Sequence, residues 1–298
     1  MAEQMATLPN GIEICYETFG DARDPAVLLV MGLGGPMGWW ATDLCEMIAA
    51  RGHFVIRYDN RDTGRSTKFR GHRVSTRDLV RAFLGKKVKT AYRMSDLADD
   101  GFGLLDHLEI EHVNLVGVSM GGMVIQTMAI SRPERVLSLT SIMSTTGKRS
   151  VGWQHPKTIP MMLSPAGNTV DSYIERSLKG GKVIGSPAFP TEDSIARARA
   201  RETYERGWIA SGVARQMIAI LTQPDRTEAL RDLEIPATVI HGTADILVNP
   251  SGGRATSAAI RGSELISVSG MGHDLPEQLH PTFTDAITRT AARAAARR

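Results

Sequence analysis

Short continuous runs of apolar residues alternate along the chain with longer segments in which apolar positions recur every three or four residues. The short runs predict buried strands, and the periodic segments predict helices that pack on them. Strands are expected at residues 11–20, 26–31, 54–58, 113–118, 136–143, 237–241 and 264–268. Helices are expected at residues 43–51, 95–108 (with Ser95 as N-cap), 123–131, 251–260 and 282–295. This alternation is typical of an α/β protein with a mostly parallel sheet and helices on both of its faces.

The alternation stops between Thr146 and Leu230, where no strand-like run appears. Prolines interrupt this part of the chain, and amphipathic stretches at residues 170–178 and 191–221 predict helices there. We therefore expect an inserted helical cap at 146–230, between an N-terminal part of the core at 1–145 and a C-terminal part at 231–298. The polar stretch at 68–89 is expected to be a mobile flap or a surface excursion.

Composition and charge indicate which classes of protein the chain can belong to. The 298 residues are 42% hydrophobic and 22% charged, which is ordinary for a globular protein with a sizeable core. The 35 basic and 32 acidic residues give a net charge of +3 and are spread along the whole length. We therefore expect no large cationic field and no nucleic-acid partner.

Two cysteines, Cys15 and Cys45, are too few for a disulfide framework and lack the spacing of zinc ligands. Both are expected to be buried thiols, and no metal is expected. No apolar run approaches the length that crossing a bilayer requires, so we expect no transmembrane segment and a cytoplasmic protein. Formation of a homo-oligomer is left open.

One motif points to covalent chemistry. Residues 117–121 read Gly-Val-Ser-Met-Gly, directly after a predicted buried strand and directly before a predicted helix. The pattern GxSxG is expected by chance in about one chain in ten of this length, so its context gives it weight. A serine on such a turn has a strained backbone that exposes its hydroxyl. Ser119 is therefore the candidate nucleophile.

A serine hydroxyl is a weak nucleophile unless a base takes its proton. Among the eight histidines, His273 follows the last predicted strand and is preceded by small residues, whereas His241 ends a strand and is expected to pack there. Asp245 lies four residues beyond His241 and is expected to orient His273. The loop after the strand at 136–143 contains no acidic residue before Asp171 and offers no other acid.

The tetrahedral intermediate of acyl transfer needs two amide donors for its oxyanion. The amide of Met120, directly after the serine and at the start of a helix, is expected to be one of them. The glycine-rich turn at 31–35 follows the second predicted strand, and its Leu33 amide is expected to be the other.

With these residues in place, the chain resembles the α/β-hydrolase superfamily from about Gly11 onward, and most of all its bacterial aclacinomycin methylesterase-type members. The resemblance rests on VMG at 30–32 with Gly38 and Trp39, VIRYDNRDTGRST at 55–67, VGVSMGG at 116–122, HGTADILVNP at 241–250 and GMGHDLP at 270–276. It implies an eight-stranded sheet and ester hydrolysis without a cofactor. Met31 departs from the family, since many members carry a histidine there, and the cap shows no substrate signature.

The main hypothesis is a carboxylic ester hydrolase, esterase or lipase-like and including methylesterases, in which Ser119 attacks the ester with His273 as base. Perhydrolase, cofactor-free haloperoxidase, lactonase and thioesterase chemistry use the same three residues and stay open. A hydrolase-fold protein that only binds a small ligand is the alternative of another class. The stretch at 59–66 is expected to support the active-site loops.

The expected partner is a small apolar ester. Its acyl pocket is predicted to be lined by apolar residues of the cap, for which a role in the core is an equal alternative. These residues are Met161, Met162, Leu163, Trp208 and Ile209.

Overall fold

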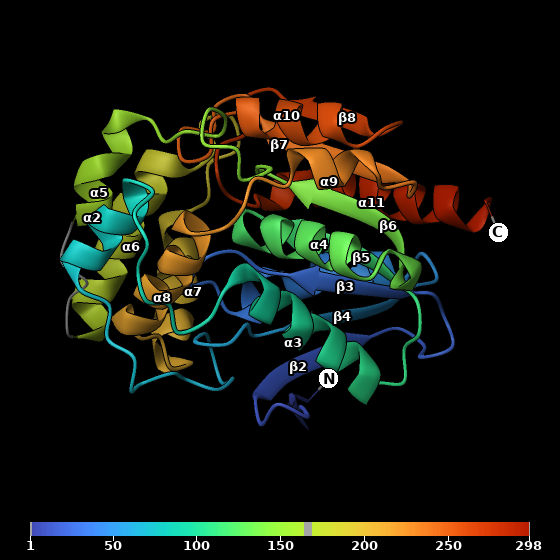
Figure 1. Ribbon diagram of the computed structural model, residues 1–298, viewed down its shortest axis with the longest axis horizontal. Coiled ribbons are helices and arrows are strands. Elements are labelled where there is room, and N and C mark those ends of the chain that lie inside the picture. The colour runs from blue at the N-terminus through green and yellow to red at the C-terminus, as the bar shows by residue number, and fades with distance from the viewer. Residues whose placement is uncertain (1, 164–168, 298) are drawn as a thin grey trace.

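The computed structural model describes residues 2–163 and 169–297, without the side chains of Met162 and Leu163. An eight-stranded sheet in the order β1-β2-β4-β3-β5-β6-β7-β8 forms its centre (Figure 1). The strands are β1 (Gln4–Thr7), β2 (Glu13–Phe19), β3 (Ala26–Val30), β4 (Phe54–Tyr58), β5 (Val113–Val118), β6 (Val136–Ile142), β7 (Ala237–Gly242) and β8 (Glu264–Val268). From β4 to β8 neighbouring strands pair in parallel, whereas β1 and β2 are antiparallel. The predicted α/β fold class is confirmed.

Helices cover both faces of the sheet because successive side chains of the buried strands point to opposite sides. On β3, Val27 and Leu29 belong to one apolar cluster and Leu28 to another. The first cluster is completed by α1 (Thr42–Ala49) and α11 (His280–Ala295), and the second by α3 (Met94–His107), α4 (Met120–Ser131), α9 (Thr227–Arg231) and α10 (Ser251–Ala259). Short 3₁₀ turns lie at Met37–Trp39, Pro133–Arg135, Pro156–Thr158 and Glu277–Leu279.

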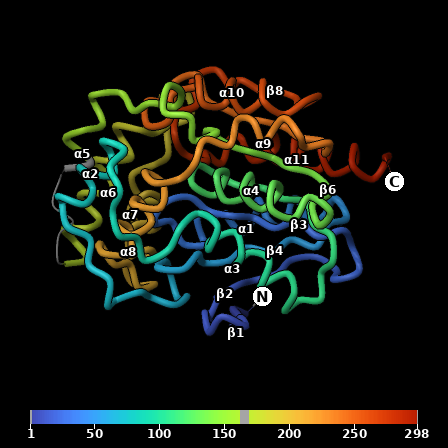
Figure 2. The backbone as a smooth tube through the Cα atoms, viewed as in Figure 1, coloured from blue at the N-terminus to red at the C-terminus, as the bar shows by residue number. Residues whose placement is uncertain are grey.

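Of the helices between β6 and β7, the four α-helices that precede α9 are grouped at one end of the molecule (Figures 1 and 2). They are α5 (Ile159–Leu163), α6 (Val170–Ile184), α7 (Asp193–Glu205) and α8 (Ala210–Leu221), which we call the cap helices. A small apolar cluster of their own joins α6 and α7. The stretch predicted as one helical segment at 191–221 is two helices, which Gly207 separates with a φ of +98°. That residues 146–230 act as a single cap stays a prediction.

The structure differs from the sequence-based elements in three places. The prediction of Ser95 as an N-cap is wrong. Helix α3 begins at Met94, and the amide of Arg93 donates to Asp96 Oδ2 at 2.7 Å. The strand β1 was not predicted from the sequence. The polar stretch at 68–89 contains a further helix, α2 (Thr76–Phe83), whose N-terminus carries a capping box between Ser75 and Asp78.

Both cysteines are free and buried, as predicted. Within the described ranges, no helix combines the length and the apolar character that crossing a bilayer requires.

Candidate active site

Ser119 lies between the last residue of β5 and the first residue of α4, in a backbone conformation that is rare for a residue with a side chain. Its φ is +54° and its ψ is −116°. The turn is held by neighbouring backbone, since the Ser119 amide donates to the Ile142 carbonyl at 2.9 Å. A Cβ at Gly117 would lie 2.3 Å from the Gly121 carbonyl oxygen, and one at Gly121 would lie 2.0 Å from that of Val30. Only glycine fits at either position, so the motif is what allows this turn.

Three side chains from distant parts of the chain form a continuous hydrogen-bonded relay. The Nε2 atom of His273 lies 3.0 Å from Ser119 Oγ, and its Nδ1 atom lies 2.7 Å from Asp245 Oδ2. Ser119 follows β5, Asp245 follows β7 and His273 follows β8. The carboxyl ends of parallel strands meet at one edge of a sheet, which explains why these loops converge.

Asp245 is fully buried, and its environment favours the charged form. Burial raises the pKa of this carboxyl, but the His273 and His241 rings and their hydrogen bonds outweigh burial and hold the pKa well below its usual range. Its Oδ1 atom also accepts from the amides of Leu247 and Val248, both at 2.9 Å. A carboxylate only accepts, so His273 Nδ1 carries the proton and Nε2 is left to accept from Ser119.

The packing of His241 was predicted from the sequence, but its contact with Asp245 was not. It is buried and packs against Gly253 of α10, as its position at a strand end suggested. Its Nε2 atom donates to the Val248 carbonyl at 2.8 Å and also lies 3.3 Å from Asp245 Oδ2. The spacing of four residues between His241 and Asp245 was the signal in the sequence for this second contact with the carboxylate.

The loop after β3 lies directly against Ser119. A Cβ at Gly32 would lie 3.2 Å from Ser119 Cβ. Leu33, one of the two expected oxyanion donors, is the next residue, and Met120, the other, opens α4. This placement is consistent with the expected amides, whose role stays a proposal.

A cap residue that sequence reasoning missed supports this loop. Buried Gln216 of α8 accepts from the Gly34 amide at 2.8 Å, and its Nε2 atom donates to the Arg61 carbonyl and to Thr63 Oγ1, both at 2.9 Å. All polar atoms of the Gln216 amide are therefore used to join α8 to two loops of the core.

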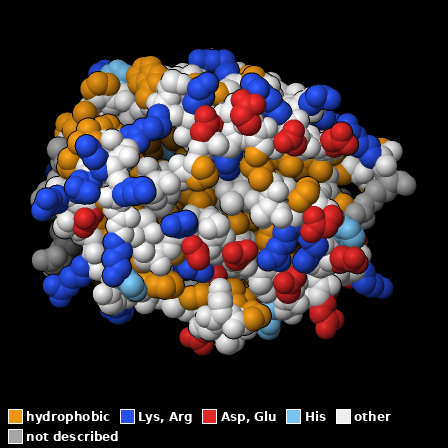
Figure 3. All heavy atoms as spheres, in the orientation of Figure 1, with side chains coloured by type: hydrophobic (Ala, Val, Ile, Leu, Met, Phe, Trp, Pro, Cys, Tyr) orange, Lys and Arg blue, Asp and Glu red, His pale blue; other side chains and the backbone are white. Residues whose placement is uncertain are grey.

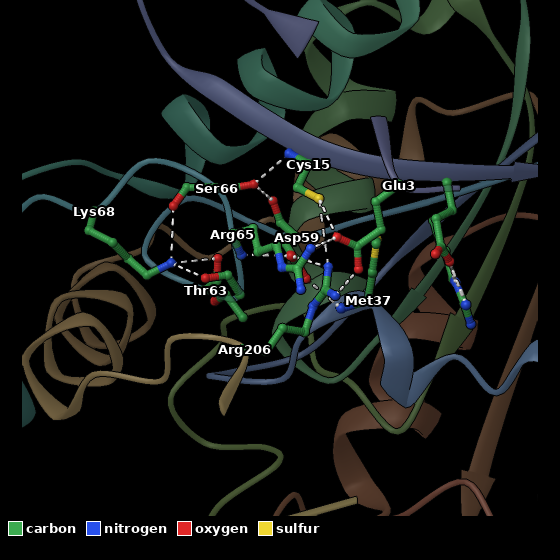
Figure 4. Close-up of polar contacts among 12 residues, drawn as sticks. Glu3, Cys15, Met37, Asp59, Thr63, Arg65, Ser66, Lys68 and Arg206 are labelled. Atoms are coloured by element: carbon green, nitrogen blue, oxygen red, sulfur yellow. Dashed lines mark hydrogen bonds and ion pairs between the residues drawn. The ribbon is translucent and has the colours of Figure 1, made fainter. Parts of the chain in front are cut away.

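Asp59 organises the polar loop after β4. Its Oδ1 atom accepts from the Met37 amide at 2.7 Å, and its Oδ2 atom accepts from the Arg65 amide at 2.9 Å and from Arg206 at 2.8 Å. Figure 4 shows Arg206, at the end of α7, between Asp59 and Glu3, with which it also forms an ion pair. These contacts agree with the expected supporting role of residues 59–66, which stays a prediction.

A second buried ion pair joins α8 to the same loop. Arg215 donates to both carboxylate oxygens of Asp62 at 2.7 and 2.8 Å, and Tyr92 donates to the same group at 2.7 Å. The side chains of Arg215 and Asp62 are 1% and 0% exposed, so neither charge has water to stabilise it.

The predicted pocket residues lie in different surroundings. Met161 packs against Gly180 of α6, and the side chains of Met162 and Leu163 lie outside the described residues. The Trp208 ring packs at a tilt against that of Tyr173 with ring centroids 4.6 Å apart, which places it beside the apolar cluster of the cap helices. It also borders a gap beside Gly34 and Val213 that is too narrow for a water molecule. Ile209 is half-buried at the start of α8. A pocket role for these residues stays a prediction.

In the part of the chain that the structure describes, no group of three His, Cys, Asp or Glu side chains could hold a metal ion.

Comparison with known proteins agrees with this architecture. The model of the alpha/beta hydrolase fold family matches residues 25–278. Rhodomycin D methylesterase DauP from Streptomyces sp. (strain C5) is 27% identical over 298 residues, covering 93% of this chain and 94% of that protein. The 3-oxoadipate enol-lactonase 2 from Acinetobacter baylyi is 27% identical and covers 82% of this chain and 80% of its own length. The esterase RhEst1 from Rhodococcus sp. ECU1013 has a similar structure, with a TM-score of 0.74 at 18% identity over 98% of this chain and 99% of that one.

The resemblance to methylesterase-type hydrolases that the sequence suggested is thus confirmed. The chain belongs to the α/β-hydrolase fold family of enzymes.

Proposed function

We propose that this protein is a serine hydrolase that cleaves carboxylic esters through an acyl-enzyme on Ser119. The observation that carries the proposal is the relay from Ser119 through His273 to Asp245, with gaps of 3.0 and 2.7 Å. Ser119 supplies the nucleophile and His273 the base that takes its proton, while Asp245 orients His273 and stabilises its charged form.

The reaction has two steps. His273 Nε2 takes the Ser119 proton as Oγ attacks the ester carbonyl, and the amides of Leu33 and Met120 stabilise the oxyanion. His273 then protonates the departing alcohol. In the second step His273 takes a proton from water as the water oxygen attacks the acyl-enzyme. It then returns this proton to Ser119 Oγ as the bond to the serine breaks and the acid leaves. Asp245 stays ionised throughout and stabilises the imidazolium.

The chemistry needs no cofactor and no metal, and the substrate is a small apolar ester. The rhodomycin D methylesterases among the relatives favour an ester with a methyl group on the alcohol side. The enol-lactonase relative supports a second candidate, a lactone, which opens by the same two steps. A cytoplasmic location and formation of a homo-oligomer stay predictions.

Turnover of p-nitrophenyl acetate and butyrate by the wild type and by Ser119→Ala tests the proposal. We expect a loss of at least about a thousandfold in kcat for the variant. Mass spectrometry after treatment with a fluorophosphonate should find one adduct on Ser119, absent from Ser119→Ala and kept by Ser263→Ala as a matched control. Absence of both turnover and adduct in the wild type would instead support a protein that only binds a ligand. A panel of methyl, ethyl and butyl esters and lactones, beside a peracid assay, then separates the related activities.

A further inference from the structure

The basic residues of the chain are concentrated in one segment. Residues 68–93 contain a single acidic residue, Asp78, whereas the whole chain has nearly as many acidic as basic residues. The basic residues of this segment are Lys68, Arg70, Arg73, Arg77, Arg81, Lys86, Lys87, Lys89 and Arg93. The expectation that charge is spread evenly and makes no cationic field is therefore wrong for this part of the molecule.

Few carboxylates lie near these charges, and within the segment only Asp78 interacts with Arg77 and Arg81. All of them except Lys68 are exposed, and none of the exposed ones forms an ion pair with another described residue. Arg81 donates only to the backbone carbonyl of Lys87, at 3.1 Å. The other arginines of this region, Arg61 and Arg215, are buried against Asp100 and Asp62. The exposed cations consequently create a field that is available to an outside partner.

Helix α2, in the middle of this segment, presents apolar side chains to solvent. Val80, Phe83 and Leu84 are 52%, 63% and 63% exposed. Their spacing of three and four residues places them on one face of the helix. The helix packs on α8 by its other side, where Ala82 is buried. The exposed apolar face is thus not required for the packing of α2 on the protein.

A neighbouring segment continues this surface. Arg149 donates to the Phe83 carbonyl and so holds the loop after β6 against the end of α2. Between residues 146 and 161 the chain has no acidic residue, and its Trp153 and Ile159 are 51% and 50% exposed. Five of the eight large apolar side chains that are exposed on the described residues belong to these two segments. Figure 3 shows orange apolar and blue basic side chains gathered at the end of the molecule that carries α2 and the cap helices.

We propose that this basic and apolar surface, formed by residues 68–93 and 146–161, docks the protein on an anionic lipid surface. Exposed Phe, Leu, Val and Trp side chains enter the boundary between headgroups and acyl chains, while Lys and Arg beside them contact anionic headgroups. A nucleic acid would use the cations but gain nothing from the aliphatic side chains of α2. A second copy of the chain would bring like charges together, which disfavours a homodimer through this surface.

The surface also lies close to the elements that support the candidate active site. Helix α2 packs on α8, and α8 carries the Gln216 side chain that bonds Gly34 beside Ser119. Docking would therefore bring the cap helices to the interface, where apolar esters accumulate. This inference goes beyond the proposed function, and its test does not depend on catalysis.

Flotation of the full-length protein with vesicles tests the proposal. Phosphatidylcholine vesicles are compared with vesicles containing 30% phosphatidylglycerol, at 50 and 500 mM NaCl. We expect binding to the anionic vesicles at low salt and loss of most of it at high salt. Lys86→Glu/Lys87→Glu should lower the bound fraction by at least about tenfold. Arg254→Glu/Arg261→Glu, the same charge change on exposed residues of the α10 region, should leave it unchanged.

The apolar contribution is tested separately. Phe83→Ala/Leu84→Ala should lower binding several-fold, whereas Met5→Ala/Leu265→Ala, which truncates two exposed apolar residues elsewhere, should not. A thermal midpoint equal to that of the wild type checks that each variant is folded. Equal binding to neutral and anionic vesicles, or no binding to either, overturns the proposal. So does binding that the Lys86 and Lys87 reversals leave intact. Binding of a DNA duplex without vesicle binding, or a dimer that Phe83→Ala/Leu84→Ala disrupts without vesicle binding, also overturns it and identifies the surface as a site for that other partner.

Discussion

The backbone amide of Gly34, two residues after Gly32 at the Ser119 turn, donates to the side chain of Gln216 at 2.8 Å. A helix from the insertion thus holds the loop that carries the expected oxyanion donor Leu33. The cap helices and the core are in this way joined at the candidate site itself.

Replacing Gln216 with leucine, which is similar in size, removes the bonds to Gly34, Arg61 and Thr63. We expect kcat for p-nitrophenyl butyrate to fall by about tenfold to a hundredfold with a smaller change in KM, because a shift of the loop by a fraction of an ångström misplaces the oxyanion donor. Gln154→Leu, at an exposed position, is the matched control. Loss of stability with an unchanged kcat would show that Gln216 only packs the cap helix.

The positive φ of Ser119 predicts that a glycine there is more stable than an alanine. A side chain at φ +54° and ψ −116° costs roughly 1–3 kcal/mol, and glycine avoids that cost. We therefore expect Ser119→Gly to have a free energy of unfolding about 1 kcal/mol or more above that of Ser119→Ala, although both are inactive. Urea unfolding measures the difference. Equal values would mean that the turn is not strained.

Arg206 is predicted to stabilise the protein far more than an arginine on the surface of the same helix. Its replacement by methionine leaves the carboxylate of Asp59, which is 0% exposed, without its cation, and should cost about 3–5 kcal/mol. Arg197→Met breaks a pair with Glu175 whose side chains are 51% and 56% exposed, and should cost at most about 1 kcal/mol. Urea unfolding with matched m-values compares the two. Similar losses would contradict the network described above.

The carboxyl of Asp274 is predicted to make the stability of the folded protein depend on pH. Burial raises the pKa of its carboxyl, although Ser186, which donates to it, and His273 oppose the rise. The folded state therefore holds the proton more tightly than the unfolded state, and stability falls as pH rises above about 4 through the raised pKa. Asp274→Asn keeps an acceptor for Ser186 without the charge. Its thermal midpoint should match the wild type near pH 4 and exceed it at pH 7 to 8.

The exposed Asp171→Asn, which is 84% exposed, should show no such divergence. The stability that Asp245 contributes depends on pH in the opposite direction. Because its pKa is lowered, this stability is present above about pH 4 and is lost as pH falls. A midpoint difference for Asp274→Asn that does not change with pH would contradict the assignment.

Trp208→Ala tests whether the indole limits the space for the acyl group beside Gly34. Removing the indole should raise kcat/KM for p-nitrophenyl octanoate relative to acetate by about tenfold, since each added methylene group gains space. Trp153→Ala, at an exposed position, is the control. If chain-length preference is unchanged while the free energy of unfolding falls by about 3–5 kcal/mol, Trp208 belongs to the apolar cluster with Tyr173 and not to a pocket.

The strands and the relay residues could be predicted from sequence for one physical reason. Strands buried on both faces are mostly apolar, as Phe54–Tyr58 and Val113–Val118 are apart from Arg57 and Asn114. The ends of each strand can therefore be predicted from the ends of an apolar run. Once the strands are known to be parallel, residues that follow them meet at one edge. Ser119, Asp245 and His273 therefore converge although 154 positions separate the first from the last.

The contacts between the cap helices and the core could not be predicted in this way. Arg206, Arg215 and Gln216 are polar residues in or next to amphipathic helices, where the sequence pattern predicts exposure to water. Their burial depends on carboxylates and amides in loops more than a hundred positions away. The four-residue strand β1 was missed because a strand so short and so exposed leaves little apolar pattern.

The ion pair between Glu3 and Arg206 joins positions 203 residues apart. A contact of such sequence separation closes a very long loop, so we expect it to form after the central sheet and α7. Its energy is then absent from the folding transition state and acts on the finished molecule. Its loss would accelerate unfolding and leave the refolding rate nearly unchanged.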